Sequence, residues 1–195
     1  MVAFSVLLLL EMLFFSAQGD VHYYDFYLRE KNYTTLCEAK SMLVGDTAFV
    51  NVRNEGNYGV TLHWHGVKQP RNPWSDGPEY VTQCTVLPKT NFTYEVIFSD
   101  EEGTLWWHAH SDWTRNTVHG AIVIYPSKEA SSPYPEPDGE EIIILGSWYA
   151  HDVNLLVAET LLNGGHLPIS DAYTINGQPG DFCACSKVIE LLAKI

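Results

Sequence analysis

The amino-acid sequence predicts an all-β protein, in which one sandwich or barrel domain is followed by part of a second domain. Short apolar stretches alternate with turns between Val21 and Pro126, and several show the period of two that half-buried strands require. A stretch rich in Pro, Ser and acidic residues, 126–139, interrupts this pattern. About 55 residues follow it, which is too few to bury a stable core alone.

Individual strands and one helix can be assigned from local pattern. The strands expected in the first domain are 47–52, 59–65, 92–98, 104–110 and 120–125. Strands at this spacing, bounded by turn residues, are typical of sandwiches and barrels. Beyond the interruption, residues 141–146 and 172–177 are expected to form strands, the second with its turn. Asp152 can cap a helix from about Val153 to Leu162, and Gly164 can end it.

The sequence divides into four predicted parts. They are a signal peptide (1–19), a first β domain (20–126), a linker (127–140) and a partial second domain (141–195). Residues 2–15 are almost wholly apolar, and small residues lead up to Gly19, after which a signal peptidase would cut. The apolar run is shorter than a comfortable membrane span, so we expect no stable span.

Two further features agree with secretion. Asn32 and Asn91 each begin an Asn-x-Thr triplet, which is an acceptor site for N-glycosylation. The four cysteines lack the paired spacing of metal knuckles, so in an oxidising compartment they would form disulfides, with several connectivities open: Cys37, Cys84, Cys183 and Cys185. We therefore predict an extracellular glycoprotein.

The overall composition excludes some classes of function. The chain is 46% hydrophobic, 13% aromatic and 18% charged, which indicates a globular protein and not a disordered one. Its net charge is −13 and Lys and Arg are not clustered, so we expect no nucleic-acid partner.

Two His-x-His pairs, His63/His65 and His108/His110, are the strongest functional signal. Residues two apart on a strand project from the same face, so each pair would present two imidazoles together. If the two strands pack near each other, four imidazoles gather in one place. Neutral imidazole binds copper, zinc, iron and nickel, and a site made only of nitrogen ligands favours copper or zinc. The other histidines stand alone in the sequence: His22, His119, His151 and His166.

Several long segments resemble the multicopper oxidases, and the plant laccases in particular. The two His-x-His segments, Leu62-His63-Trp64-His65-Gly66 and Trp106-Trp107-His108-Ala109-His110-Ser111, are similar to the first two copper motifs of that family. The segments 71–84, 117–121 and 170–181 are similar to plant laccases. The resemblance extends over most of residues 20–186, with the motifs in the family's order.

This resemblance implies a cupredoxin-like antiparallel sandwich of Greek-key type, followed by an incomplete second cupredoxin domain. It implies copper as cofactor, with His63 on a type 2 copper, His65 and His108 on one type 3 copper, and His110 on the other. Asp76 matches an acidic residue near the type 2 copper, where a carboxylate could relay protons. Its other reading is an ordinary Asp-Gly turn residue. The implied partners are O2 and phenols such as diphenols and lignin precursors, and the implied location is the apoplast.

The sequence also departs from the family's pattern. Lys40–Val44 leads directly into Gly45-Asp46-Thr47 where the family has a longer segment, so we expect a lost strand and an unpaired sheet edge. By family position Cys37 would pair with Cys185, and Cys183 is a surplus thiol. The chain holds no His-Cys-His motif of the kind that binds type 1 copper.

These features are compatible with three functions. The leading one is a truncated laccase that contributes half of a trinuclear copper site. The second is a non-catalytic, secreted copper-binding domain, since half a cluster can bind metal without turnover. The third is a zinc hydrolase, because His108 to Asp112 fits a His-x-His-x-Asp pattern; however, Trp113 follows where such hydrolases place another His. For the chain alone, we expect no phenol oxidation at a laccase-like rate.

Overall fold

The computed structural model of the chain describes residues 19–29, 40–112, 114–127, 134–135, 137–166 and 168–178. Residues 40–42 are described by their backbone alone. Three of the sequence predictions concern residues outside these ranges: the signal peptide before Gly19, glycosylation at Asn32, and pairing of Cys37 with Cys185.

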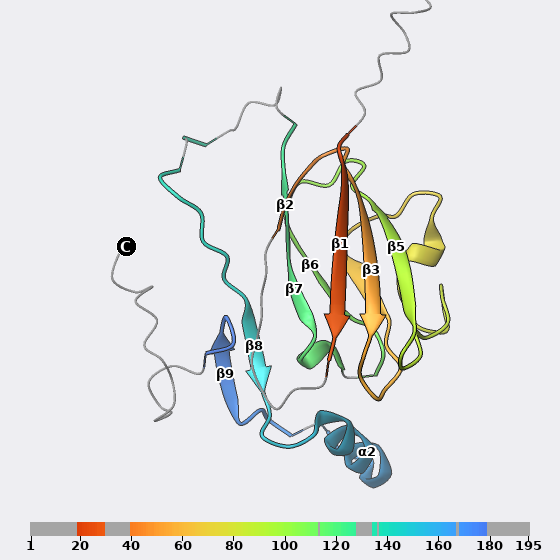
Figure 1. The fold of residues 1–195 in the computed structure, drawn as a ribbon. Coiled ribbons are helices and arrows are strands. Elements are labelled where there is room, and N and C mark those ends of the chain that lie inside the picture. Colours follow the sequence, from red (N-terminus) through yellow and green to blue (C-terminus); the bar gives the residue numbers. More distant parts are fainter. Residues whose placement is uncertain are drawn as a thin grey trace, which may run out of the picture.

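Two sheets pack face to face and form the predicted sandwich (Figure 1). The first sheet has the order β1-β3-β5, from β1 (Val21–Leu28), β3 (Thr47–Asn54) and β5 (Asn91–Ile97). The second sheet has the order β2-β7-β6-β4, from β2 (Lys40–Leu43), β7 (His119–Tyr125), β6 (Gly103–Ala109) and β4 (Leu62–His65). The alternatives left open by the sequence are thereby decided in favour of a sandwich.

The strand directions differ in part from the expected antiparallel arrangement. β1 pairs with β3, and β2 with β7, in parallel. The chain passes from β1 to β2 in the opposite sheet and turns back at Gly45 into β3. Because β2 takes the chain back to its starting end, β3 runs in the same direction as β1, as the two arrows in Figure 1 show. The short segment before Gly45 still forms a strand, and β1 and β2 are both edge strands.

The core lies between the two sheets and follows the period-two pattern. Alternate residues of the central strand β3 point inward and are almost wholly buried: Ala48, Val50 and Val52. From the facing strands come Leu62, Trp64, Ile122 and Ile124, and from β5 come Tyr94 and Val96. Burying such side chains contributes roughly 1.5–3 kcal/mol each and fixes the strands that carry the histidines.

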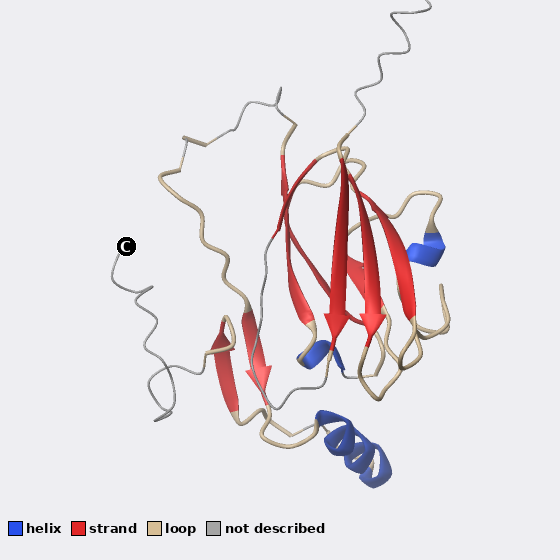
Figure 2. Cartoon of the chain, in the orientation of Figure 1, coloured by secondary structure: helices blue, strands red, loops and turns tan. Residues whose placement is uncertain are grey.

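The second part contains a two-stranded ribbon and one helix (Figure 2). The ribbon pairs β8 (Leu145–Trp148) with β9 (Ala172–Ile175), and the helix is α2 (Val153–Asn163). The helix matches its prediction: the Asp152 side chain accepts from two backbone amides of the first turn, and Gly164 ends the helix in a left-handed conformation. None of the described helices is long and apolar enough to cross a membrane.

The strand expected at 141–146 lies later, at Leu145–Trp148. The side chain of Asn176 explains the difference. Its Oδ1 accepts from the Ile144 amide (2.8 Å) and its Nδ2 donates to the Ile142 carbonyl (2.9 Å). A side-chain amide thus occupies backbone groups that a partner strand would otherwise pair, which delays the ribbon until Leu145.

Candidate metal centre

The pairing of β4 with β6 places the two His-x-His segments side by side. His63 lies directly opposite His108, and His65 lies opposite Trp106. Residues opposite each other in an antiparallel pair share one face of the sheet. Leu62, Trp64 and Ala109 occupy the other face and are buried in the core. The imidazoles therefore project from the outer face of the β2-β7-β6-β4 sheet, and the core holds their backbone in place.

Three of these imidazoles converge within metal-binding distance. One ring nitrogen each of His63, His65 and His108 lie within 4.8 Å of one another. The ring centroid of His63 is 5.5 Å from that of His65 and 5.4 Å from that of His108, and the latter two are 5.6 Å apart. His108 is 4% exposed, His63 is half-buried and His65 is exposed. The cluster is thus open to solvent on the side of His65.

His110 follows the end of β6 and lies against the same group. Its ring centroid is 5.4 Å from that of His63 and 5.7 Å from that of His108. Its backbone amide donates to the Thr61 carbonyl (2.8 Å), while the Thr61 amide donates to Ser111 Oγ (2.9 Å). These two bonds extend the β4–β6 connection past the last ladder residue and hold His110 beside the other three histidines.

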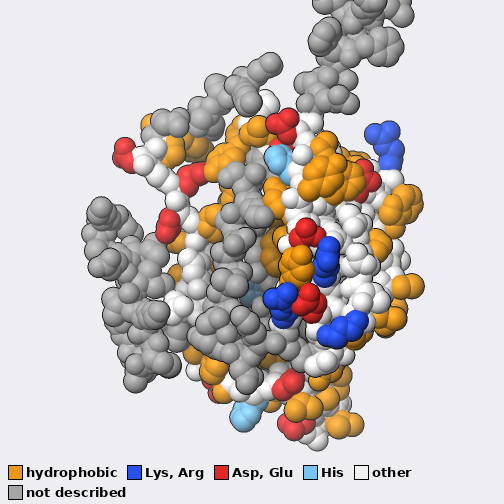
Figure 3. Space-filling view, viewed as in Figure 1, with side chains coloured by type: hydrophobic (Ala, Val, Ile, Leu, Met, Phe, Trp, Pro, Cys, Tyr) orange, Lys and Arg blue, Asp and Glu red, His pale blue; other side chains and the backbone are white. Residues whose placement is uncertain are grey.

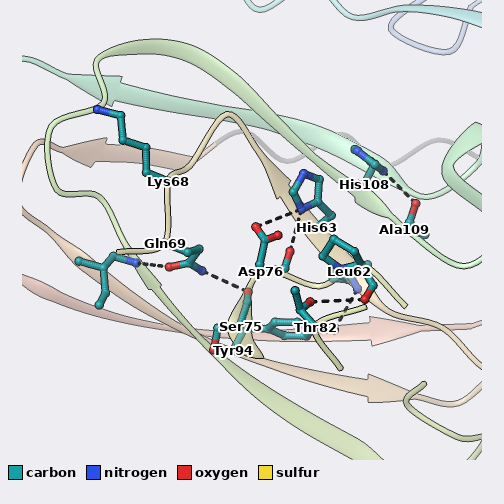
Figure 4. A network of polar contacts seen from close by, with 12 residues as sticks. Leu62, His63, Lys68, Gln69, Ser75, Asp76, Thr82, Tyr94, His108 and Ala109 are labelled. Carbon is teal, nitrogen blue, oxygen red and sulfur yellow. Dashed lines mark hydrogen bonds and ion pairs between the residues drawn. The ribbon is translucent and has the colours of Figure 1, made fainter. Parts of the chain in front are cut away.

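Backbone carbonyls select which nitrogen of two rings faces the cluster (Figure 4). His63 Nδ1 lies 2.7 Å from the Asp76 carbonyl oxygen, and His108 Nδ1 lies 2.9 Å from the Ala109 carbonyl oxygen. A carbonyl can only accept, so both Nδ1 atoms carry the proton. In the neutral form of each ring, Nε2 then carries the lone pair that can bind a metal.

The loop after β4 brings Asp76 back to His63. It contains η1 (Pro73–Ser75), and Gly77 follows with φ of +101°. A Cβ at Gly77 would lie 1.7 Å from the Leu62 carbonyl oxygen, so the loop packs against β4 more closely than any side chain would allow. Gln69 Nε2 donates to the Ser75 carbonyl (3.1 Å), and Ser75 Oγ accepts from the Glu95 amide (3.1 Å), which fastens the loop to β5.

The carboxylate of Asp76 is farther from the ring than its carbonyl. Asp76 Oδ1 lies 3.4 Å from His63 Nδ1, and the Asp76 side chain is 28% exposed. The carboxylate is therefore both near the ring and partly in contact with solvent. The sequence drew attention to this carboxylate and gave no indication of the two carbonyl acceptors, because every residue carries a carbonyl.

The environment of the cluster favours the neutral form of His108. Burial lowers the pKa of His108, and the neighbouring rings of His63, His110 and His65 lower it further, against the opposing effect of the bond to Ala109. Neutral imidazole is the ligand form. An all-imidazole donor set of this kind fits copper.

Tryptophans pack around the histidines on both faces of the sheet. The Trp106 ring lies 4.2 Å from His108 and 5.4 Å from His65, measured between centroids, and it is 40% exposed. Trp64 lies in the core against Tyr94. Trp107 packs against Phe26 of β1. Of these three tryptophans, Trp106 is the one whose ring lies against the imidazoles.

Three other residues that the sequence singled out lie on strands or loops of the first domain: His119, Asn91 and Cys84. His119 lies opposite His108 in the β6–β7 pairing, and its Nδ1 donates to the Arg115 carbonyl (2.9 Å), just beyond η2 (Thr114–Asn116). Asn91 is exposed at the start of β5. Cys84 is exposed and has no disulfide partner among the described residues.

The visible face of β1 and β3 carries charges of both signs side by side (Figure 3). Two ion pairs lie on this face, between Arg29 and Glu55 and between Arg53 and Asp25.

The family model for multicopper oxidases matches residues 32–129, and the chain belongs to the multicopper oxidase family. Among curated proteins it is similar to laccases of plants. It is 52% identical over 183 residues to a putative laccase-9 of Oryza sativa subsp. japonica, covering 87% of this chain and 32% of that protein. It is 45% identical over 186 residues to laccase-14 of Arabidopsis thaliana, covering 88% and 33%. The chain thus spans about a third of the length of these laccases.

Solved structures agree on the fold. A laccase from Botrytis aclada superimposes with a TM-score of 0.69 at 24% identity, covering 89% of this chain and 34% of that chain. A multicopper oxidase that functions in iron import superimposes with a TM-score of 0.71 at 22% identity, covering 81% and 33%. These matches confirm the expected cupredoxin-like fold, and family membership confirms copper as the cofactor.

Proposed function

We propose that this chain supplies the first half of a laccase-type trinuclear copper site in a secreted protein. The observation that carries the proposal is the convergence of the ring nitrogens of His63, His65 and His108 within 4.8 Å, with the His110 ring against them. In this assignment His63 binds a type 2 copper, His65 and His108 bind one type 3 copper, and His110 binds the other.

The reaction proposed for the whole protein is the one-electron oxidation of phenols coupled to reduction of O2 to water. Copper at this site would supply the redox-active centre for O2 reduction. The residues of this chain position the ligands: the Asp76 and Ala109 carbonyls fix the protons of His63 and His108 on Nδ1, so that Nε2 is presented to the metal. The phenols and the apoplastic location come from the likeness to plant laccases, as does the proton-relay role of Asp76.

The position of Asp76 is compatible with proton transfer. Its carboxylate lies 3.4 Å from His63 Nδ1 and is partly exposed, so it can exchange protons with solvent while it remains beside the cluster. Because the nearer Asp76 carbonyl already orients the ring, the carboxylate is not required to hold His63 in place.

The second candidate is a copper-binding domain without turnover, and one sequence feature favours it. The 195 residues hold no His-Cys-His motif, and a type 1 copper site needs a thiolate together with imidazoles. Without such a site, single electrons from a phenol have no entry point. We therefore expect this chain alone to bind copper and not to oxidise phenols at a laccase-like rate.

Copper titration of the purified chain tests the proposal. We expect binding in preference to zinc, measured by metal analysis after dialysis, and loss of most of it in a variant with His63 and His108 replaced by Ala. The matched control replaces His151 and His166, which are exposed and lie beyond the linker. Equal copper content in the two double variants would contradict the proposal. Oxygen uptake with a simple diphenol then separates the two candidates, because uptake abolished by His65→Ala would mean that the chain turns over unaided.

A further inference from the structure

The carboxylate of Asp46 is a buried acceptor on which three segments meet. Asp46 is 2% exposed. Its Oδ1 accepts from the Asp20 backbone amide (2.8 Å), and its Oδ2 accepts from His22 Nε2 (2.8 Å) and the Leu43 amide (2.9 Å). A buried carboxylate is costly unless donors or a cation compensate it. Burial raises the pKa of Asp46, but the bonds from Leu43, His22 and Asp20 outweigh it and leave that pKa lowered, so the group is ionised.

One of these donors is the backbone nitrogen of Asp20, the first residue after the predicted cleavage site. Cleavage after Gly19 would make the Asp20 nitrogen the new α-amino group of the mature chain. We propose that the mature N-terminal ammonium of Asp20 forms an ion pair with the buried Asp46 carboxylate, so that removal of the signal peptide stabilises the first domain. This inference rests on the proposed secretory processing and is independent of copper binding.

The geometry requires little change after cleavage. The Asp20 carbonyl accepts from the Thr47 amide (3.0 Å), so residue 20 is anchored by its far side as well. Gly19 packs tightly against the turn between β2 and β3: a Cβ at residue 19 would lie 1.9 Å from the Gly45 carbonyl oxygen. Removal of Gly19 vacates that space, and the amide with one N–H becomes an ammonium with three. The added positive charge then lies at hydrogen-bond distance from a carboxylate shielded from water, where attraction is stronger than at the surface.

The ion pair would connect both sheets to the N-terminus. The Asp46 amide donates to Leu43 at the end of β2 (3.1 Å), its carbonyl accepts from Phe98 (2.9 Å) after β5, and Gly45 donates to the Phe98 carbonyl (2.6 Å). Within the part of the chain that the structure describes, the other titratable groups that interact with Asp46 are His22 and Tyr24, both on β1, while Asp20 itself is exposed. Any effect of the ammonium on the pH dependence of stability must therefore be distinguished from the effect of His22.

Titration of the amine tests the proposal directly. The full chain is expressed in a secreting host, its N-terminal peptide is identified by mass spectrometry, and its α-amine is labelled by reductive ¹³C-methylation and titrated by NMR. We expect Asp20 at the N-terminus and an amine pKa at least about one unit above the ordinary 7.7–8.0. The same sample titrated in denaturant should return the ordinary value, a reference that needs no variant. Asp46→Asn should abolish the increase, and the control His22→Gln should retain it. A different N-terminus, or an ordinary amine pKa in the native protein, overturns the inference.

Stability gives a second readout. In Asp20→Gln the new N-terminus can be cyclised to pyroglutamate, which keeps an N–H but removes the charge, whereas Asp20→Asn keeps the ammonium. A group whose pKa is raised on folding stabilises the fold below its unfolded pKa and loses that effect as pH rises through the folded value. The melting temperature of Asp20→Asn should therefore exceed that of the cyclised variant at pH 7 and approach it above about pH 10. Identical pH profiles of the two variants would overturn the inference.

Discussion

The ring of His63 is held by the backbone carbonyl of Asp76, which lies 2.7 Å from Nδ1, while the Asp76 carboxylate oxygen lies 3.4 Å from the same atom. The shorter contact comes from a group that a side-chain substitution does not remove. The orientation of a proposed copper ligand and the proposed proton relay are therefore separable functions of one residue.

Asp76→Asn should separate the orientation of His63 from the proposed proton relay. The substitution keeps the carbonyl and the size of the side chain, so we expect copper affinity to change by less than about tenfold. Replacement of His63 by Ala removes a ligand and should cost more than that. Competition with a copper chelator measures both variants. A loss in Asp76→Asn as large as that in His63→Ala would show that the carboxylate, and not the carbonyl, holds the ring.

Gly77→Ala should disrupt the site from a distance. A methyl group at residue 77 would meet the Leu62 carbonyl and push the loop, with the Asp76 carbonyl, away from His63. Gly103→Ala is the matched control, because Gly103 has a similar φ of +97° but nothing within 4 Å of its Cβ position. Positive φ alone costs about 1–3 kcal/mol. We expect Gly103→Ala to lose about that much stability in urea unfolding with copper binding intact, and Gly77→Ala to lose more, together with copper binding. Equal behaviour of the two variants would contradict the close-packing argument.

Tyr94 should make the fold sensitive to alkali. Burial raises the pKa of Tyr94 from its ordinary value of 10 to about 12, against the opposing effect of the bond that its hydroxyl accepts from the Leu62 amide. The folded state thus favours the neutral phenol, and this contribution is complete below pH 10 and is lost as pH rises toward 12. Tyr94→Phe should lack this alkaline decline. At neutral pH it should be less stable by about 1–3 kcal/mol, since the Leu62 amide loses its partner. Urea unfolding followed by circular dichroism at several pH values measures the stability of both proteins. An equal loss of stability at high pH in the wild type and in Tyr94→Phe would show that Tyr94 is not the group responsible.

Trp106→Leu should loosen two ligands at once. The indole ring lies against His108 and His65 on the outer face, so we expect it to restrict the rotation of both rings. Leu keeps an apolar side chain but lacks the flat surface, so we expect roughly tenfold weaker copper binding with little change in stability. Trp148→Leu is the control, as Trp148 is similarly exposed (45%) but belongs to β8. Unchanged copper affinity in Trp106→Leu would show that Trp106 does not support the two histidine ligands.

Local pattern in the sequence determined much of this protein. The spacing of His63 and His65 placed both on one face of β4, because side chains of a strand alternate with a period of two. His108 lies on β6, whereas His110 follows the end of that strand and is held by the Thr61 carbonyl. The limits of α2 followed from Asp152 and Gly164, since caps act within one turn. For β4 and α2 the deciding interactions are between residues close in the chain.

Tertiary structure decided how these pieces meet. That β4 lies beside β6 in the register that sets His63 opposite His108 depends on core contacts between distant segments, as does the parallel pairing of β1 with β3. The carbonyl of Asp76 reaches His63 only because Gly77 lets the loop close on β4. Tertiary structure also explains why the strand predicted at 141–146 begins only at Leu145. The side chain of Asn176, which is distant in sequence, binds the backbone of Ile142 and Ile144. Sequence pattern encodes which face a side chain occupies, whereas packing between segments decides which faces and which backbone groups come together.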